Sequence, residues 1–179
     1  MLTTPRTGLW ASRNHAIDTF NLANSAIQDG TLALGNVAAY PTSNLAIYVP
    51  IRVKVPGVVV KLALSVGTAS GNFDIGLYSA AGVRLVSSGS TAMSGSTTEQ
   101  VVDVTDTTIG VGRYYVAVNV DNTTATLMRD ANTAPWAAAV GILTEALGAV
   151  TLPATATWAV NQTLAYIPMM AVLFETTVA

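Results

Sequence analysis

The chain has 179 residues, which is enough for one domain with a substantial core and short for two. Apolar residues make up 51% of it and charged residues only 10%, far below the roughly 25% of an ordinary soluble domain. The eight Lys and Arg are scattered and the net charge is −2, so the charge pattern gives no support to a nucleic-acid partner.

Residues 1–44 show only weak periodicity, and we expect an extended N-terminal arm. An irregular stretch of this length is unusual inside a compact domain, so the arm is expected to lie along a neighbouring subunit or to add an edge strand. A disordered tail is the less favoured alternative, because the segment carries large apolar residues. These are the candidate interaction residues of the arm: Trp10, Phe20, Leu22 and Ile27.

Residues 45–179 are expected to form one β-domain, because most of this stretch alternates between apolar and polar residues as strands do. Its clearest unit is a hairpin within residues 71–91. Phe73, Ile75 and Leu77 give this hairpin an apolar face, and the opposite face is mostly polar. Gly82 supplies the positive φ of a tight turn. A hairpin cannot bury its apolar face alone, so a second sheet is expected against it.

Eight strands are predicted in all, and they fit an antiparallel β-sandwich, with the eight-stranded jelly roll as the expected version. Immunoglobulin-like sandwiches of seven or nine strands remain the alternative. Pro50 predicts an edge or a bulge in its strand, and Pro168 predicts the start of the last strand or a bulge there. The predicted strands are 45–54, 58–66, the two arms of the hairpin, 99–104, 112–119, 124–129 and 166–174.

Residues 130–165 are expected to leave the sandwich as a long excursion. A helix is predicted over 135–147, opened by Pro135 and ended at Gly148. Trp136 and Trp158 make the excursion a candidate contact surface. The alternative is that both tryptophans cap one end of the sandwich, as buried aromatic residues usually do.

The sequence favours no enzyme chemistry. His15 is its single histidine and lies in the arm, there is no Cys, and none of the nucleophile-elbow, phosphate-loop or zinc motifs occurs. The acidic pair Asp103 and Asp106 and the turn at Asp121 and Asn122 are weak candidates for Ca²⁺, but turn formation is the better explanation. We therefore expect no catalytic residue, no cofactor and no metal.

No secretion signal and no membrane span is expected from the sequence either. The N-terminus lacks an apolar core segment of the Sec type. The most apolar stretch, 55–66, is far too short to span a bilayer and alternates like a strand.

Residues 44–121 resemble a β-sandwich module of tailed-bacteriophage structural proteins. Four motifs in order carry the resemblance: N-x-A-x-x-x-P, G-N-x-D-x-G-x-Y, G-x-R-L-V-S-x-G and G-x-Y-Y-x-A. They correspond here to Asn44, Ala46 and Pro50; to Gly71, Asn72, Asp74, Gly76 and Tyr78; to Gly82, Arg84, Leu85, Val86, Ser87 and Gly89; and to Gly112, Tyr114, Tyr115 and Ala117.

The resemblance implies a virion structural protein made in the host cytoplasm. The expected role is a capsid decoration, or cement, protein on the capsid exterior that binds between major capsid subunits. Closed symmetry would multiply weak contacts, so a homotrimer is expected. The alternative is a tail or fibre component that binds a host glycan. Neither role requires nucleic acid or membrane as a partner.

Overall fold

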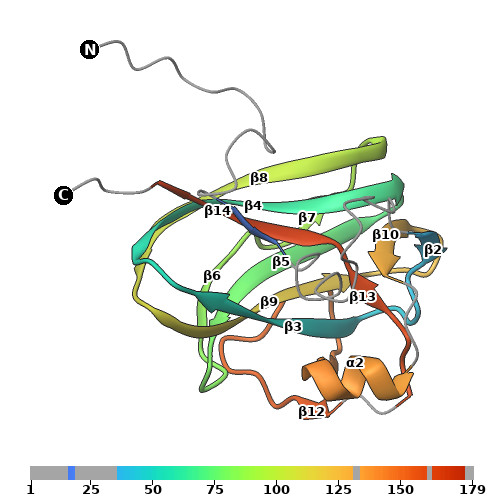
Figure 1. The fold of residues 1–179 in the computed structure, drawn as a ribbon. Coiled ribbons are helices and arrows are strands. Elements are labelled where there is room, and N and C mark those ends of the chain that lie inside the picture. The colour runs from blue at the N-terminus through green and yellow to red at the C-terminus, as the bar shows by residue number, and fades with distance from the viewer. Residues whose placement is uncertain (1–15, 19–35, 131–133, 161–162, 176–179) are drawn as a thin grey trace, which may run out of the picture.

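The computed structural model describes residues 16–18, 36–130, 134–160 and 163–175, and their regular structure is almost entirely β-strand (Figure 1). Two antiparallel sheets pack against each other, which confirms the predicted all-β sandwich. The jelly roll is not confirmed, because the described strands form two sheets of seven.

The first sheet is centred on β4, which has β8 on one side and β14 and β10 on the other. The short strands β1 and β2 pair with the outer sides of β14 and β10. The strands of this sheet are β1 Ala16–Asp18, β2 Asn36–Ala39, β4 Gly57–Thr68, β8 Ser96–Ile109, β10 Thr126–Asp130, β13 Ile167–Pro168 and β14 Met170–Glu175.

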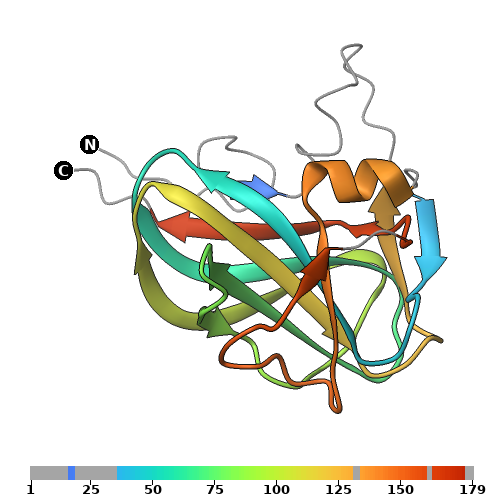
Figure 2. The ribbon, with the colours of Figure 1, turned by 90° about the horizontal axis from the view of Figure 1, so that it is seen from below.

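The second sheet runs in the order β12, β11, β3, β9, β5, β6, and β7 also pairs with β5. Among the crossings between the sheets, two are short turns at residues 54–56, from β3 to β4, and at 110–111, from β8 to β9 (Figure 2). The strands of this sheet are β3 Leu45–Val53, β5 Asn72–Ser79, β6 Arg84–Ser87, β7 Thr91–Ala92, β9 Gly112–Val120, β11 Leu143–Ala146 and β12 Ala159–Val160. The helix α2 Ala134–Val140 lies between β10 and β11 in the chain.

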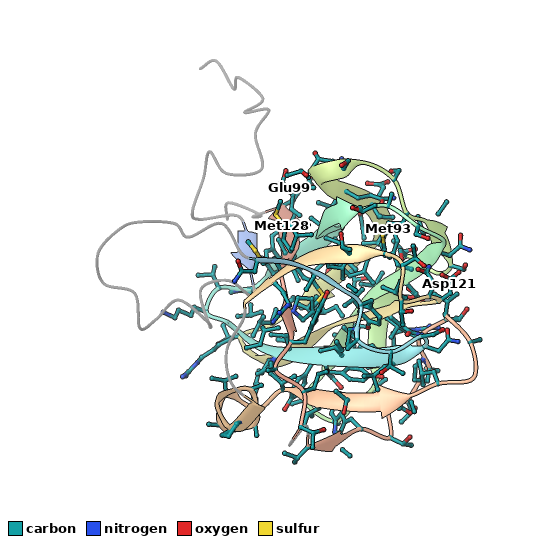
Figure 3. All side chains as sticks on the ribbon, turned by 90° about the vertical axis from the view of Figure 1, so that its right-hand side faces the viewer. Met93, Glu99, Asp121 and Met128 are labelled. Carbon is teal, nitrogen blue, oxygen red and sulfur yellow. The ribbon has the colours of Figure 1, made fainter. Side chains whose placement is uncertain are left out.

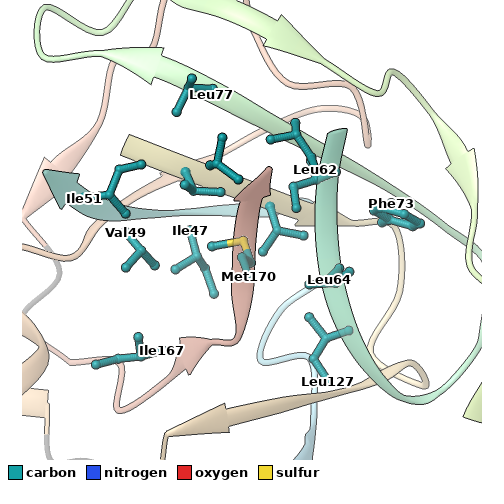
Figure 4. Packing of buried hydrophobic residues seen from close by; sticks show 14 of the residues in the cluster. Ile47, Val49, Ile51, Leu62, Leu64, Phe73, Leu77, Leu127, Ile167 and Met170 are labelled. Carbon is teal, nitrogen blue, oxygen red and sulfur yellow. The ribbon is translucent and has the colours of Figure 1, made fainter. Parts of the chain in front are cut away.

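The core lies between the two sheets, and the strand alternation places it there (Figure 4). Ile47, Val49 and Ile51 point inward from β3, and Phe73, Ile75 and Leu77 point inward from β5, as predicted. One stretch of β4 departs from strict alternation. A register shift between Val59 and Lys61 turns Val59 rather than its neighbours into the core.

Both prolines lie where pairing is interrupted. β11 pairs with β3 only from Leu45 to Tyr48, so Pro50 comes after that ladder has ended and no N–H is needed on that side. Pro168 ends β13, and β14 begins two residues later at Met170.

The sandwich begins earlier than residue 45 in the described chain. Residues 36–39 form β2 against β10, and Tyr40 is 1% exposed in the core. The Tyr40 hydroxyl donates to the carbonyl of Val118 at 3.0 Å. Part of residues 1–44 thus adds an edge strand, which is one of the two arrangements expected for the arm, and the sandwich includes residues before the predicted boundary.

The excursion is also organised differently from the prediction. The helix stops at Val140, because Gly141 adopts a φ of 86° and donates its N–H to the carbonyl of Ala138 at 3.0 Å. Residues 143–146, which were predicted as helix, instead form β11 and extend the second sheet beside β3. Backbone pairing with an open sheet edge outweighs the helical propensity of this short segment.

After β11 the chain crosses the outer face of the second sheet (Figure 2). A second apolar cluster forms there, separate from the main core. The mostly polar face of the hairpin is consequently covered, and Asp74 on it is 0% exposed. The buried members of this cluster are Ala46, Tyr48, Tyr78, Tyr115, Ala117 and Leu152.

Candidate functional site

The predicted interaction residues fall into three groups. Trp10, Phe20, Leu22 and Ile27 lie outside the described residues. Trp136 belongs to α2, but the structure describes nothing of its side chain. Trp158 is described and is half-buried on the outer face of the second sheet. The structure does not bring Trp158 to an end of the sandwich, and we take its surroundings as the candidate site.

Trp158 packs into a cluster of three tyrosines that come from three neighbouring strands. Its ring centroid lies 5.1 Å from that of Tyr48 on β3, 6.4 Å from Tyr78 on β5 and 4.6 Å from Tyr115 on β9. Pairs at these separations are favourable, and those to Tyr48 and Tyr78 have the edge-on geometry that aromatic rings prefer. The tryptophan therefore fastens the excursion to the sheet.

Glu145 completes the polar side of this cluster. Its carboxylate accepts a hydrogen bond from the Tyr48 hydroxyl at 2.8 Å and another from the Thr157 hydroxyl at 2.6 Å. Burial, followed by the hydrogen bond to Glu145, raises the pKa of Tyr48 well above its ordinary value. The phenol thus stays protonated and remains a donor at all physiological pH values.

Two further bonds hold the middle of the excursion. The Tyr78 hydroxyl donates to the carbonyl of Pro153 at 2.6 Å, and the Arg84 guanidinium donates to the carbonyl of Leu152. On the other side of the cluster, the Arg113 guanidinium lies over the Tyr115 ring, 5.4 Å from its centroid. The hydroxyls of Tyr48 and Tyr78 and the Arg84 guanidinium are thus engaged with the protein itself, and this arrangement suits a structural role better than catalysis.

A buried polar pair lies on the same face of the sheet. Asp74 and Asn119 are directly opposite on β5 and β9, and both are 0% exposed. The Asp74 carboxylate accepts from the backbone N–H of Leu152 at 2.9 Å and from the Ser88 hydroxyl at 3.2 Å. The Asn119 amide donates to the carbonyls of Ala149 and Val150 at 2.9 and 2.8 Å. Both side chains therefore bind backbone groups of the excursion, among them the N–H of the buried Leu152, which would otherwise lack a partner.

One hydrogen-bond acceptor of this pair has no partner: the side-chain oxygen of Asn119 is buried and unpaired. Burial raises the pKa of the Asp74 carboxyl above its ordinary value, although the Leu152 N–H, Ser88 and the charge of Arg84 act in the opposite direction. The charged form of Asp74 is thus destabilised by folding.

This arrangement predicts a pH effect. Because the pKa of Asp74 is raised in the folded state, its contribution to stability is full below the unfolded value, about 3.9, and is lost as the pH rises through the folded value. Asp74→Asn cannot ionise and keeps an oxygen for Leu152. Urea unfolding at pH 4 and pH 7 is expected to show that the variant gains stability relative to the natural chain as the pH rises.

The control for this experiment is Asp103→Asn, since the Asp103 side chain is 84% exposed. Its stability difference from the natural chain is expected to change far less between the two pH values. Equal pH dependence of Asp74→Asn and the natural chain would contradict the assignment.

Three of the four candidate Ca²⁺ residues have other partners. Asp121, labelled in Figure 3, accepts from the backbone N–H of Asn72 at 3.0 Å, and Asn122 accepts from the N–H groups of Thr124 and Ala125 at 2.9 and 2.8 Å. Asp103 lies 4.0 Å from Lys61. Within the described ranges no group of three or more acidic or histidine side chains is placed to hold a metal ion. His15 lies outside those ranges.

Sequence reasoning missed Asp74, Asn119 and Glu145 as organising residues. One feature of the sequence could have indicated this site. Tyr48, Tyr78 and Tyr115 lie on the outer faces of their strands, and the excursion carries a tryptophan that can pack against them. Such a set of aromatic residues on the supposed solvent face of a sheet indicates that something covers it.

Comparison with known proteins does not assign the chain to a family. The chain matches no protein-family model and no curated protein. The likeness of residues 44–121 to a phage module therefore stays a prediction. As for a membrane, no helix in the described part of the chain has the length and apolarity needed to cross one.

Proposed function

We propose that this chain is a structural protein of a tailed-bacteriophage virion, and specifically a homotrimeric decoration protein that binds between major capsid subunits on the capsid exterior. The chain is proposed to act by binding alone, without catalysis.

The observation that carries the proposal is the role of the motif residues. Gly71 has a φ of 61°, and a Cβ there would lie 2.2 Å from Asp121, so the turn requires glycine. Asp74 and Tyr78 hold the excursion through Leu152 and Pro153. The residues that carry the resemblance thus serve the architecture of the sandwich, as expected of a module used for its shape.

The surface supports the same reading. With charged residues at only 10% of the chain, binding depends on apolar and main-chain contacts spread over many copies. Several valines are prominent on the described surface, including Val55 at 66% exposure on the turn from β3 to β4 and Val111 at 64% on the turn from β8 to β9. Such positions suit packing against a protein lattice.

A density map of the virion tests the placement. We expect density for this sandwich on the outer surface of the head, at positions of threefold symmetry. Density confined to the tail would reject decoration in favour of the alternative, a tail or fibre component.

A deletion tests the fastening role of the N-terminal arm. Removing residues 1–35 takes away the three-residue edge strand β1 but spares β2 and Tyr40, so we still expect a folded sandwich with a melting temperature close to that of the full chain. Its affinity for capsids that lack the protein is expected to fall at least about tenfold, which corresponds to about 1.4 kcal/mol. Capsid binding as tight as that of the full chain would show that the arm is not the fastener.

A further inference from the structure

The longest of the described strands lies at an edge. β8 spans 14 residues and pairs along its length with β4, whose opposite side is taken by β14 and β10. Among the described strands none pairs with the other side of β8, which is the uppermost strand in Figure 1. An edge of this kind presents main-chain N–H and C=O groups that can bind a further strand.

The β8 edge is acidic. Three of the ten acidic residues of the chain, Glu99, Asp103 and Asp106, lie on this strand, which has no basic residue, and all three are exposed. Figure 3 shows Glu99 at the rim of the molecule. Lys61 of β4 lies 4.0 Å from Asp103 and offsets one of these charges, so the edge keeps a net negative charge. A strand that binds here should be basic.

The first 15 residues of the chain have the complementary composition. They contain Arg6 and Arg13 and no acidic residue, and they include Leu9 and Trp10. Their length is close to that of β8. Pro5 and Gly8 limit regular pairing to the part that follows them.

The position of β1 decides which copy of β8 is within reach. Residues 16–18 pair with β14, so β1 and β8 lie on opposite sides of the first sheet, three strand spacings or about 14 Å apart. Arg13 is three residues from Ala16, and three extended residues span at most about 11 Å. With β1 in place, Arg13 cannot reach the open side of its own β8, but it can reach that of a neighbouring copy.

We propose that residues 6–15 of one copy add as a strand to the open edge of β8 in a second copy, with Arg6 and Arg13 facing its acidic side chains. Because the two surfaces differ, the contact is head-to-tail and closes into a ring when the rotation allows, as a trimer requires. This inference rests on the homo-oligomer and on the fastening arm of the proposed function, and it names the surface that the arm binds.

The absence of cysteine allows a direct test by disulfide formation. One chain carries Arg13→Cys; a second chain, made distinguishable by a size tag, carries Val101→Cys, Asp103→Cys or Asp106→Cys. After mixing and mild oxidation, a disulfide between the two kinds of chain is expected for at least one of the three positions. Thr151→Cys, an exposed position on the excursion over the other sheet, is the control and should not link.

The arm could bind β8 of its own copy or β8 of a second copy. A single chain that carries both cysteines of the pair that links most efficiently distinguishes these two arrangements. Links between chains support the proposal. Links formed only within one chain, or no link at any β8 position above the Thr151 control, overturn it.

A charge swap provides the second measurement. Arg6→Glu with Arg13→Glu is expected to weaken self-association at least tenfold in sedimentation experiments, and adding Glu99→Lys with Asp106→Lys to the same chain should restore it. Failure of the swap to restore association would overturn the charge pairing. Both experiments use the free protein, so a tail location in the virion would reject capsid decoration without affecting this result.

Discussion

Ile75→Asp is expected to unfold the domain. Ile75 lies in the middle of β5, is 0% exposed and belongs to the core between the two sheets. A carboxylate placed there without a partner costs several kcal/mol, on top of the lost apolar packing. Since a whole domain is stabilised by only about 5–15 kcal/mol, little folded protein should remain. The measurement is thermal unfolding followed by circular dichroism.

Two variants control for the position and for the chemistry. Ile75→Val keeps an apolar side chain and should cost about 0.5–1.5 kcal/mol. Val55→Asp introduces the same carboxylate at a site that is 66% exposed, where a change within about 0.5 kcal/mol is expected. A melting temperature of Ile75→Asp equal to that of the natural chain would show that β5 faces the other way.

Ile75 also illustrates what the sequence can determine. The alternation of apolar residues along β3, β5 and β9 depends only on the two-residue period of a strand, so the inward faces of these strands follow from local pattern. The turn at Gly82 is equally local: its φ is 83°, and its N–H donates to the carbonyl of Ser79 at 3.0 Å. Both features were predicted correctly because no distant segment determines them.

The outer face of the second sheet could not be predicted in the same way. Asp74 and Asn119 alternate with apolar residues as solvent-facing residues do, yet both are buried by residues 147–158, far along the chain. β11 was missed for a related reason, since it is a short segment that becomes a strand only by pairing with β3. The local pattern of apolar and polar residues does not reveal these contacts between distant segments.

Trp158→Ala is expected to be the most damaging change outside the main core. The side chain packs against Tyr48, Tyr78 and Tyr115 and holds the excursion over the sheet. Truncating a fully buried tryptophan costs about 3–5 kcal/mol, and since Trp158 is half-buried we expect about 2–4 kcal/mol. Urea unfolding measures the loss. Tyr48→Phe, which removes only the hydroxyl that donates to Glu145, should cost about 1 kcal/mol.

The same variant separates a structural tryptophan from one that binds a ligand. If Trp158 serves as a clamp, Trp158→Phe should restore most of the stability, because an aromatic ring again fills the space among the three tyrosines. Capsid binding by Trp158→Ala should then fall only as far as the folded fraction falls. An unchanged stability together with lost attachment to host cells would instead make Trp158 part of a glycan site, and would favour the tail or fibre role over capsid decoration.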